Sequence, residues 1–204
     1  MKLFGSPASP YVRKARVLLS EKNIPCEFVI EDPWPAESKI PSLNPLGKVP
    51  VLQIAPDKCL FESVLVVHYL NQLDGKPLQP RDAAGYWQAQ WWQALGNGMI
   101  DAAVMRVFEM RRPADKQIPE KMQREETRIA RAFAAADHDY GGGRFLAGDT
   151  FTLADLSMGV ACQYIDFRYP HDWRGQYPRL MRWFSSISER PSFQSTLPPG
   201  FTPV

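Results

Sequence analysis

The chain has 204 residues, of which 45% are hydrophobic and 12% aromatic, and its formal net charge is +2. This length and composition are those of a globular protein with one large domain or two small ones. The basic residues form no long run, which argues against a surface for nucleic acid or for an anionic membrane. No apolar stretch approaches the roughly 20 residues that are needed to cross a bilayer.

Cysteine and histidine are few and widely separated in this sequence. Cys26, Cys59 and Cys162 show neither a disulfide framework nor the spacing of metal ligands. The three histidines are too far apart to form a paired metal-binding motif. We therefore predict no bound metal. Because the N-terminus begins directly with a strand pattern and not with a signal peptide, we also expect a cytoplasmic location.

The first stretch of the chain predicts a strand, a turn and a helix. Residues 2–4 are a short apolar strand, residues 5–9 a polar turn and residues 10–22 a helical run. Pro10 suits the first helical position, so Ser9 is the expected N-cap. A helix N-terminus carries about half a positive charge and unpaired N–H groups, and it can therefore hold an anion.

Ser9 has two interpretations. The simpler one is a cap without further function, because serine is among the commonest cap residues. The alternative is a hydroxyl that hydrogen-bonds a thiolate brought by a ligand. The segment Ser9-Pro10-Tyr11-Val12 resembles the Cys-Pro-Tyr-Cys of a glutaredoxin with both sulfurs replaced. Without those sulfurs, thiol–disulfide exchange at this helix start is excluded.

A second strand is predicted at residues 26–30, which completes a βαβ unit with a right-handed crossover. Residues 31–42 are rich in proline and polar side chains and are predicted to be a loop. Trp34 in this loop either covers a cleft or packs onto the body of the protein. The sequence favours neither of these two positions.

A turn from Asn44 leads into a third strand at residues 51–54. Pro50 heads this strand and cannot donate to its ladder, so it belongs at an edge or a bend. If the Val49–Pro50 bond is cis, the main chain of Val49 faces outward. Its N–H and C=O groups can then pair with an extended peptide as a neighbouring strand would.

A fourth strand at residues 59–61 is followed by Glu62 and Ser63, which open a helix that runs to residue 73. The simpler interpretation of this pair is a cap with a favourable acid in the first turn. The more specific one is a clamp for an α-amino acid head group. Glu62 would bind its ammonium, while Ser63 and the helix N–H groups would bind its carboxylate.

The predicted domain boundary is a polar segment rich in glycine and proline. Residues 76–82 are the linker between an N-terminal domain at 1–75 and a C-terminal domain at 83–204. The C-terminal part is predicted to be all-helical, with helices at 83–112, 118–140, 152–167 and 177–189. Thr152 and Asp155 have the spacing of a capping box.

Taken in order, these motifs resemble the cytosolic glutathione transferases over nearly the whole chain. The matching parts are the helix start at Ser9, residues 44–52, the Glu62-Ser63 helix start, the helical second half and residues 151–155. The pattern is most similar to bacterial serine-type members related to the theta, tau and zeta types. The resemblance implies an α/β thioredoxin-like N-terminal domain, an all-α C-terminal domain, a cis Val49–Pro50 bond and a homodimer.

The resemblance also implies which residues bind glutathione. These are Ser9, Lys48, Val49, Pro50, Glu62 and Ser63. Glu62 and Ser63 match the residues that hold the γ-glutamyl unit, and Val49 matches the main-chain partner of the cysteinyl unit. Either Lys48 or Lys39 matches the residue that meets the glycyl carboxylate.

The implied activity is that of a glutathione transferase that takes glutathione as its cosubstrate and serves detoxification. Ser9 would be the catalytic residue and would stabilise the thiolate for attack on a small hydrophobic electrophile. Candidates to line a cleft for that electrophile are Tyr11, Trp34, Met105, Phe108 and Tyr164, for each of which core packing is an equal explanation. Two alternatives stay open: a glutathione-dependent isomerase, lyase or peroxidase on the same fold, and a non-enzymatic binding protein.

Overall fold

The computed structural model describes residues 1–169 and 171–203 and divides into two compact units. The first unit comprises Met1–Pro77 and Arg190–Phe201, and the second is built on Leu78–Glu189. The first unit contains a four-stranded sheet and the second consists of helices and loops, which confirms the predicted fold class. Among the described residues, no helix is both long and apolar enough to span a membrane.

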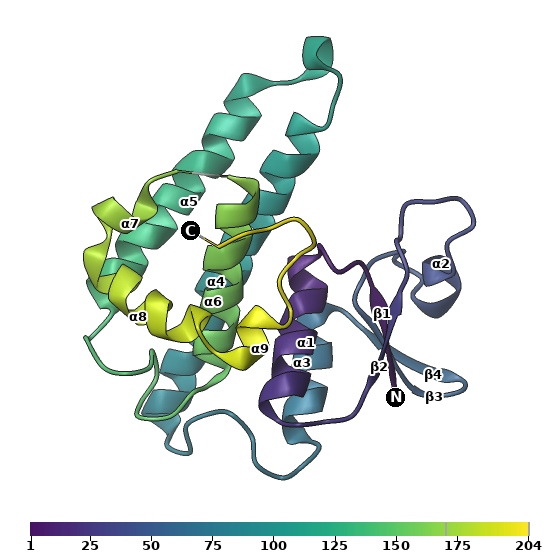
Figure 1. The fold of residues 1–204 in the computed structure, drawn as a ribbon, viewed down its shortest axis with the longest axis horizontal. Helices are drawn as coiled ribbons and strands as arrows, with labels where there is room; N and C mark the ends of the chain where they lie inside the picture. The colour runs from purple at the N-terminus through teal and green to yellow at the C-terminus, as the bar shows by residue number, and fades with distance from the viewer. Residues whose placement is uncertain (170, 204) are drawn as a thin grey trace. The chain divides into compact units, whose positions relative to one another are not determined.

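The first unit is a small mixed sheet with helices packed against it. Its elements are β1 Lys2–Gly5, α1 Pro10–Glu21, β2 Glu27–Ile30, α2 Ile40–Leu43, β3 Val51–Ala55, β4 Lys58–Phe61, α3 Ser63–Gln72 and α9 Pro191–Gln194. The strand order is β2-β1-β3-β4, with β1 parallel to β2 and β3 antiparallel to both of its neighbours. The parallel pairing of β1 with β2 confirms the βαβ unit. Figure 1 shows α1 and α3 together on one side of this sheet.

The buried face of α1 fixes the start of this helix against the sheet. Val12, Ala15 and Leu18 have the spacing of one helix face, and all three are fully buried. A Cβ atom on Gly5 would overlap with the side chain of Val12. Only glycine therefore allows the end of β1 to pass so close to the first turn of α1.

The segment Arg190–Phe201 returns to the first unit and packs on α1. Arg190 Nε donates to Glu21 Oε1 at 2.8 Å, and Arg13 Nη2 donates to the carbonyl of Phe193 at 2.9 Å. Burial raises the pKa of Glu21, but hydrogen bonds and the charge of Arg190 lower it, and the net direction is down. The domain predicted at 83–204 included this segment. The structure attaches it to the N-terminal unit through contacts between residues far apart in the chain.

The second unit is organised around one long helix. Its elements are α4 Ala83–Met110, η1 Ala114–Lys116, α5 Pro119–Asp139, α6 Leu153–Arg168, α7 Trp173–Gln176 and α8 Pro178–Ser188. Helix α4 packs against both α5 and α6. At the α4–α6 crossing, a Cβ atom on Gly96 would lie 2.9 Å from the main-chain carbon of Ser157. The two helices meet this closely because Gly96 has no side chain.

The start of α6 is a fully buried capping box. Thr152 accepts from the Ala154 N–H, and Asp155 accepts from the Thr152 N–H at 2.9 Å. Asp155 also accepts from the Leu146 N–H at 2.9 Å and from Trp183 Nε1 at 3.0 Å. The capping box predicted from the sequence is confirmed, and it additionally connects α6 to a loop and to α8.

Three short helices and a 3₁₀ turn differ from the sequence prediction. Helix α2 lies at the end of the segment predicted to be a loop, and η1, α7 and α9 had no prediction as helices. Each has only three or four residues. An element of one turn cannot display a repeating apolar spacing, and such a turn forms in response to its surroundings.

Candidate functional site

Ser9 is the N-cap of α1. Its backbone is extended, with φ −79° and ψ 125°, and its Oγ accepts from the Val12 N–H at 3.4 Å. This distance is long for such a bond, and the bond uses a lone pair of the oxygen only. The hydroxyl hydrogen therefore remains able to donate to an anion at the helix start.

A positively charged residue, Arg13, lies one helical turn after Ser9 on α1. Arg13 begins the next turn and donates its main-chain N–H to the Ser9 carbonyl at 3.0 Å. The pKa of Arg13 is lowered to about 9, mainly by burial and to a smaller extent by the charge of Arg16. The Arg13 guanidinium donates to Thr196 and Phe193, so it is the helix N-terminus that favours negative charge near the first turn of α1.

The segment before β3 is organised by Asn44, a buried residue. Its Nδ2 donates to the Lys48 carbonyl at 2.7 Å, and its Oδ1 accepts from the Leu46 N–H at 2.9 Å. The next peptide bond, Val49–Pro50, is cis, as the resemblance implied. In the described part of the chain, no hydrogen bond uses the main-chain N–H or C=O of Val49.

Glu62 precedes α3 in a backbone conformation that is rare for its residue type. Its φ is +71°, and among residues 1–169 and 171–203 the other non-glycine residue with positive φ is Asn23. Asparagine tolerates this region well, whereas a glutamate is strained there. Strain of this kind costs of order 1–3 kcal/mol and is concentrated at functional sites.

The Glu62 carboxylate lies over the first turn of α3. It accepts from the Val64 N–H at 3.0 Å and from the Leu65 N–H at 3.3 Å. Ser63, which is buried, donates its hydroxyl to Glu62 Oε1 at 3.2 Å. The carboxylate is itself exposed, so it caps the helix and can also be reached by an ammonium group from outside. The cap is therefore made by Glu62, and the Ser63 side chain is its partner.

The two candidate lysines are both exposed. Lys39 precedes α2, and its main-chain N–H donates to Glu31 Oε1 at 3.1 Å. Lys48 follows the turn that Asn44 holds. Considering the described residues only, neither ammonium lies within ion-pair distance of a carboxylate. The geometry does not choose between Lys39 and Lys48.

The remaining candidates are divided between the two units. Tyr11 and Trp34 belong to the first unit, and Trp34 is 69% exposed. Met105, Phe108 and Tyr164 belong to the second unit, where Tyr164 is buried and the other two are exposed.

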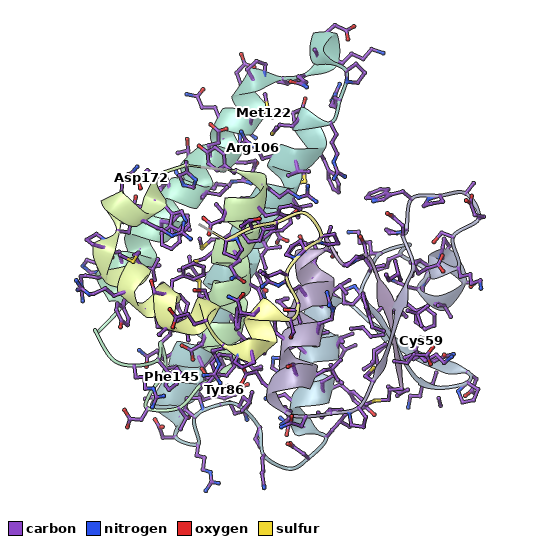
Figure 2. All side chains as sticks on the ribbon, viewed as in Figure 1. Cys59, Tyr86, Arg106, Met122, Phe145 and Asp172 are labelled. Atoms are coloured by element: carbon purple, nitrogen blue, oxygen red, sulfur yellow. The ribbon has the colours of Figure 1, made fainter. Side chains whose placement is uncertain are left out.

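The described residues contain no cluster of three or more side chains that could hold a metal ion. Cys26, Cys59 and Cys162 are free thiols, and Cys59 on β4 is labelled in Figure 2.

Sequence reasoning missed the role of Asn44 and the strain at Glu62. The signal for Asn44 was present, because asparagine before proline commonly organises a turn through its side chain. The backbone of Glu62 gave no local signal, because glutamate is not a residue type that favours a positive φ.

Comparison with known proteins identifies the family. Residues 3–78 match the glutathione S-transferase N-terminal domain and residues 119–186 match the C-terminal domain. An uncharacterized GST-like protein of Escherichia coli, YibF, is 35% identical over 201 residues, which cover 98% of this chain and 99% of YibF. Glutathione S-transferase F7 of Arabidopsis thaliana is 30% identical over 214 residues, covering 97% of this chain and 99% of its own.

Solved structures agree with this result. A glutathione S-transferase of Methylobacterium radiotolerans in complex with glutathione sulfonate has a TM-score of 0.91 and 33% identity, covering 100% of this chain and 97% of its own. Another from Methylobacillus flagellatus with bound glutathione has a TM-score of 0.90 and 36% identity, covering 97% and 98%. A family member from Pseudomonas fluorescens with bound S-(propanoic acid)-glutathione has a TM-score of 0.84 and 32% identity, covering 98% of each chain. This chain therefore belongs to the glutathione S-transferase family.

Proposed function

We propose that this protein is a glutathione transferase in which Ser9 activates the thiol of bound glutathione for attack on a small electrophile. The observation that carries the proposal is the Ser9 hydroxyl at the N-terminus of α1, with a hydrogen free to donate. Relatives of similar sequence over nearly the whole chain bind glutathione or its derivatives. The ligand of the Pseudomonas protein is a thioether of glutathione, which is the class of product that thiol conjugation yields.

The chemistry needs the thiol to lose its proton. A free thiol has a pKa near 8.5, so only a few per cent is thiolate at neutral pH. One hydrogen bond from Ser9 and a helix N-terminus together can lower the thiol pKa by roughly one to two units, at about 1.4 kcal/mol per unit. The thiolate then forms a C–S bond, and the electrophile either loses its leaving group or gains a proton.

The rest of the site would hold the tripeptide. The exposed Glu62 carboxylate would pair with the ammonium of the γ-glutamyl unit, and Ser63 would bind the neighbouring carboxylate. The Val49 main chain, which has no other hydrogen bond in the described chain, would pair with the cysteinyl unit beside Pro50. Lys48 or Lys39 would meet the glycyl carboxylate. Glutathione is the cosubstrate.

The test is the variant Ser9→Ala with a haloarene as the electrophile. We expect kcat to fall about tenfold or more, because one charge-assisted hydrogen bond to the thiolate is lost. Glutathione should still bind, with a Kd within about threefold of the original by calorimetry. Ser9→Thr, which keeps a hydroxyl, should retain activity. Ser6→Ala, which removes a hydroxyl from the same turn, serves as the matched control.

The outcomes separate the competing functions. Unchanged kcat in Ser9→Ala would leave Ser9 as a cap only. Glutathione that is recovered unconsumed, or as its disulfide, would favour an isomerase, lyase or peroxidase. Absence of glutathione binding at millimolar concentration would favour a non-enzymatic binding protein.

We also propose that the protein is a homodimer. Trp87 and Trp91 lie one turn apart on α4 and are 69% and 41% exposed. Two large indoles on one helix face form an apolar surface of the kind that marks a protein interface. Sedimentation velocity should give the mass of two chains, and Trp87→Glu with Trp91→Glu should give the mass of one. A wild-type mass of one chain would contradict this proposal.

A further inference from the structure

The ends of α4 and α6 lie side by side, because Arg106 Nη1 on α4 donates to the main-chain carbonyl of Arg168 at 3.5 Å, and each end carries an arginine. Arg168 is the last residue of α6, and Arg111 is the C-cap of α4. Tyr164 stands one turn before Arg168, and the Arg168 Cζ atom lies 5.9 Å from its ring centroid. The charges of both Arg168 and Arg111 act on the Tyr164 hydroxyl. The three side chains therefore form one group, which we call the arginine pair with Tyr164.

The acids near this group are already engaged with other cations. Glu126 pairs with Arg106, which is labelled in Figure 2, at 2.7 Å. Asp166 pairs with Arg174 at 2.7 Å.

Glu109, on α4, is likewise occupied. It accepts from the Ile118 N–H at 2.8 Å and lies 3.6 Å from Arg112. Within residues 1–169 and 171–203, neither Arg111 nor Arg168 lies within ion-pair distance of a carboxylate. The group thus has two positive charges that the surrounding acids leave uncompensated.

Part of the Arg168 guanidinium is also buried. Its Nε has no hydrogen-bond acceptor among the described residues. A buried donor without an acceptor costs about 1–3 kcal/mol, and more when the group is charged. Tyr164 beside it is 5% exposed, and burial raises the pKa of its hydroxyl while the two arginines oppose that shift. The tyrosine stays protonated at neutral pH and can donate, so every polar group here favours an anion.

Apolar side chains occur on the same helix ends as the arginine pair. Phe108 stands three residues before Arg111 on α4 and is 40% exposed, and Met105 is 56% exposed. The Phe167 ring lies 3.9 Å from the Arg168 Cζ atom. A guanidinium that stacks on an aromatic ring keeps its N–H donors in a plane suited to two carboxylate oxygens. The positive charge of the arginine pair therefore occurs together with apolar side chains at the ends of α4 and α6.

We propose that the arginine pair with Tyr164 binds the anionic group of an aromatic or otherwise apolar carboxylate, and that the electrophile of this enzyme is such an anion. That the bound molecule is the electrophile rests on the proposed function. That the group binds an aromatic anion rests only on the contacts within the second unit.

Two substrates of matched shape test the first part. Both 4-chloro-3-nitrobenzoate and 4-chloro-3-nitrobenzamide react by forming a C–S bond at the ring carbon that loses chloride, and they differ in charge. We expect kcat/KM to favour the benzoate over the benzamide. In Arg111→Gln with Arg168→Gln, the ratio of the two kcat/KM values should fall about tenfold or more, because a charged bidentate contact is lost. Arg111→Gln alone, an exposed substitution, should lower the ratio in the same direction.

The control is Arg131→Gln, which removes an exposed arginine from α5. It should leave the ratio within about twofold, since a distant surface charge is screened by salt. An equal fall in this control, or an unchanged ratio in both arginine-pair variants, would overturn the proposal.

A second measurement needs neither glutathione nor catalysis. The fluorescence of the aromatic anion 1-anilinonaphthalene-8-sulfonate should report binding to the wild type, and the double variant should weaken it about tenfold. The neutral N-phenyl-1-naphthylamine should bind both proteins alike. If glutathione conjugation fails but the anion still binds through these arginines, the proposed function fails and the anion site stands. If both dyes bind all proteins alike, the anion site fails.

Discussion

The starts of α3 and α6 use the same kinds of residue for different purposes. Both have a hydroxyl residue and an acid beside the first turn. At α6, Asp155 is fully buried and accepts hydrogen bonds from three other residues. At α3, Glu62 is exposed and has a strained backbone, and among the described residues its carboxylate accepts only from Ser63, Val64 and Leu65 at its own helix start. Burial with satisfied bonds indicates a structural cap, whereas exposure with strain supports our proposal that Glu62 is a binding group.

The largest effect should come from breaking the buried cap. Asp155→Ala leaves the Leu146 N–H, the Thr152 N–H and Trp183 Nε1 without their acceptor, so we expect a loss of about 3 kcal/mol or more in the free energy of unfolding. Urea denaturation measures this loss. Asp155→Asn, which keeps one oxygen acceptor, should lose less. If Asp155→Ala unfolded at the wild-type midpoint, the cap would not be structural.

The packing that holds α6 can be tested separately from its cap. Gly96→Ala places a Cβ atom 2.9 Å from the Ser157 main chain, and we expect about 2 kcal/mol of destabilisation from this overpacking. Gly98→Ala, two residues along the same helix, meets nothing within 4 Å. It should be neutral or stabilising by up to about 1 kcal/mol because alanine favours a helix. Both variants are compared at one protein concentration, since association changes apparent stability. Equal midpoints for the two would argue against the close α4–α6 contact.

The smallest effect on stability should come from the exposed helix start. Glu62→Gly relieves the positive φ but removes the cap, two changes of about 1 kcal/mol each that oppose one another. We therefore expect an almost unchanged melting temperature together with about a tenfold weaker affinity for glutathione, because the partner of its ammonium is lost. Calorimetry measures the affinity. Glu62→Gln keeps an oxygen for the cap and removes only the charge, so it isolates the charged contact. Full affinity in both variants would place the ammonium elsewhere.

Much of the fold could be predicted because it is specified locally. The strands, the six helices of ten or more residues in the described part of the chain and the capping box at Thr152 follow from apolar spacing and from residues with strong positional preferences. The candidate site positions Ser9, Val49–Pro50 and Glu62-Ser63 could be chosen from the sequence because they stand at helix and strand starts, and their binding of glutathione stays a prediction. The one-turn helices and the role of Asn44 in the turn before β3 were not predicted.

The sequence by itself determined where elements begin, which residues cap them and to which family the chain is similar, because these properties depend on neighbours within one or two turns. The tertiary structure alone decided that Arg190–Phe201 returns to α1, that Trp183 donates to Asp155, and that the end of α4 lies beside Arg168. It also gave Glu62 its strained backbone. These features join residues that lie far apart in the chain, and their energies come from burial and charge pairing that form only when the elements pack.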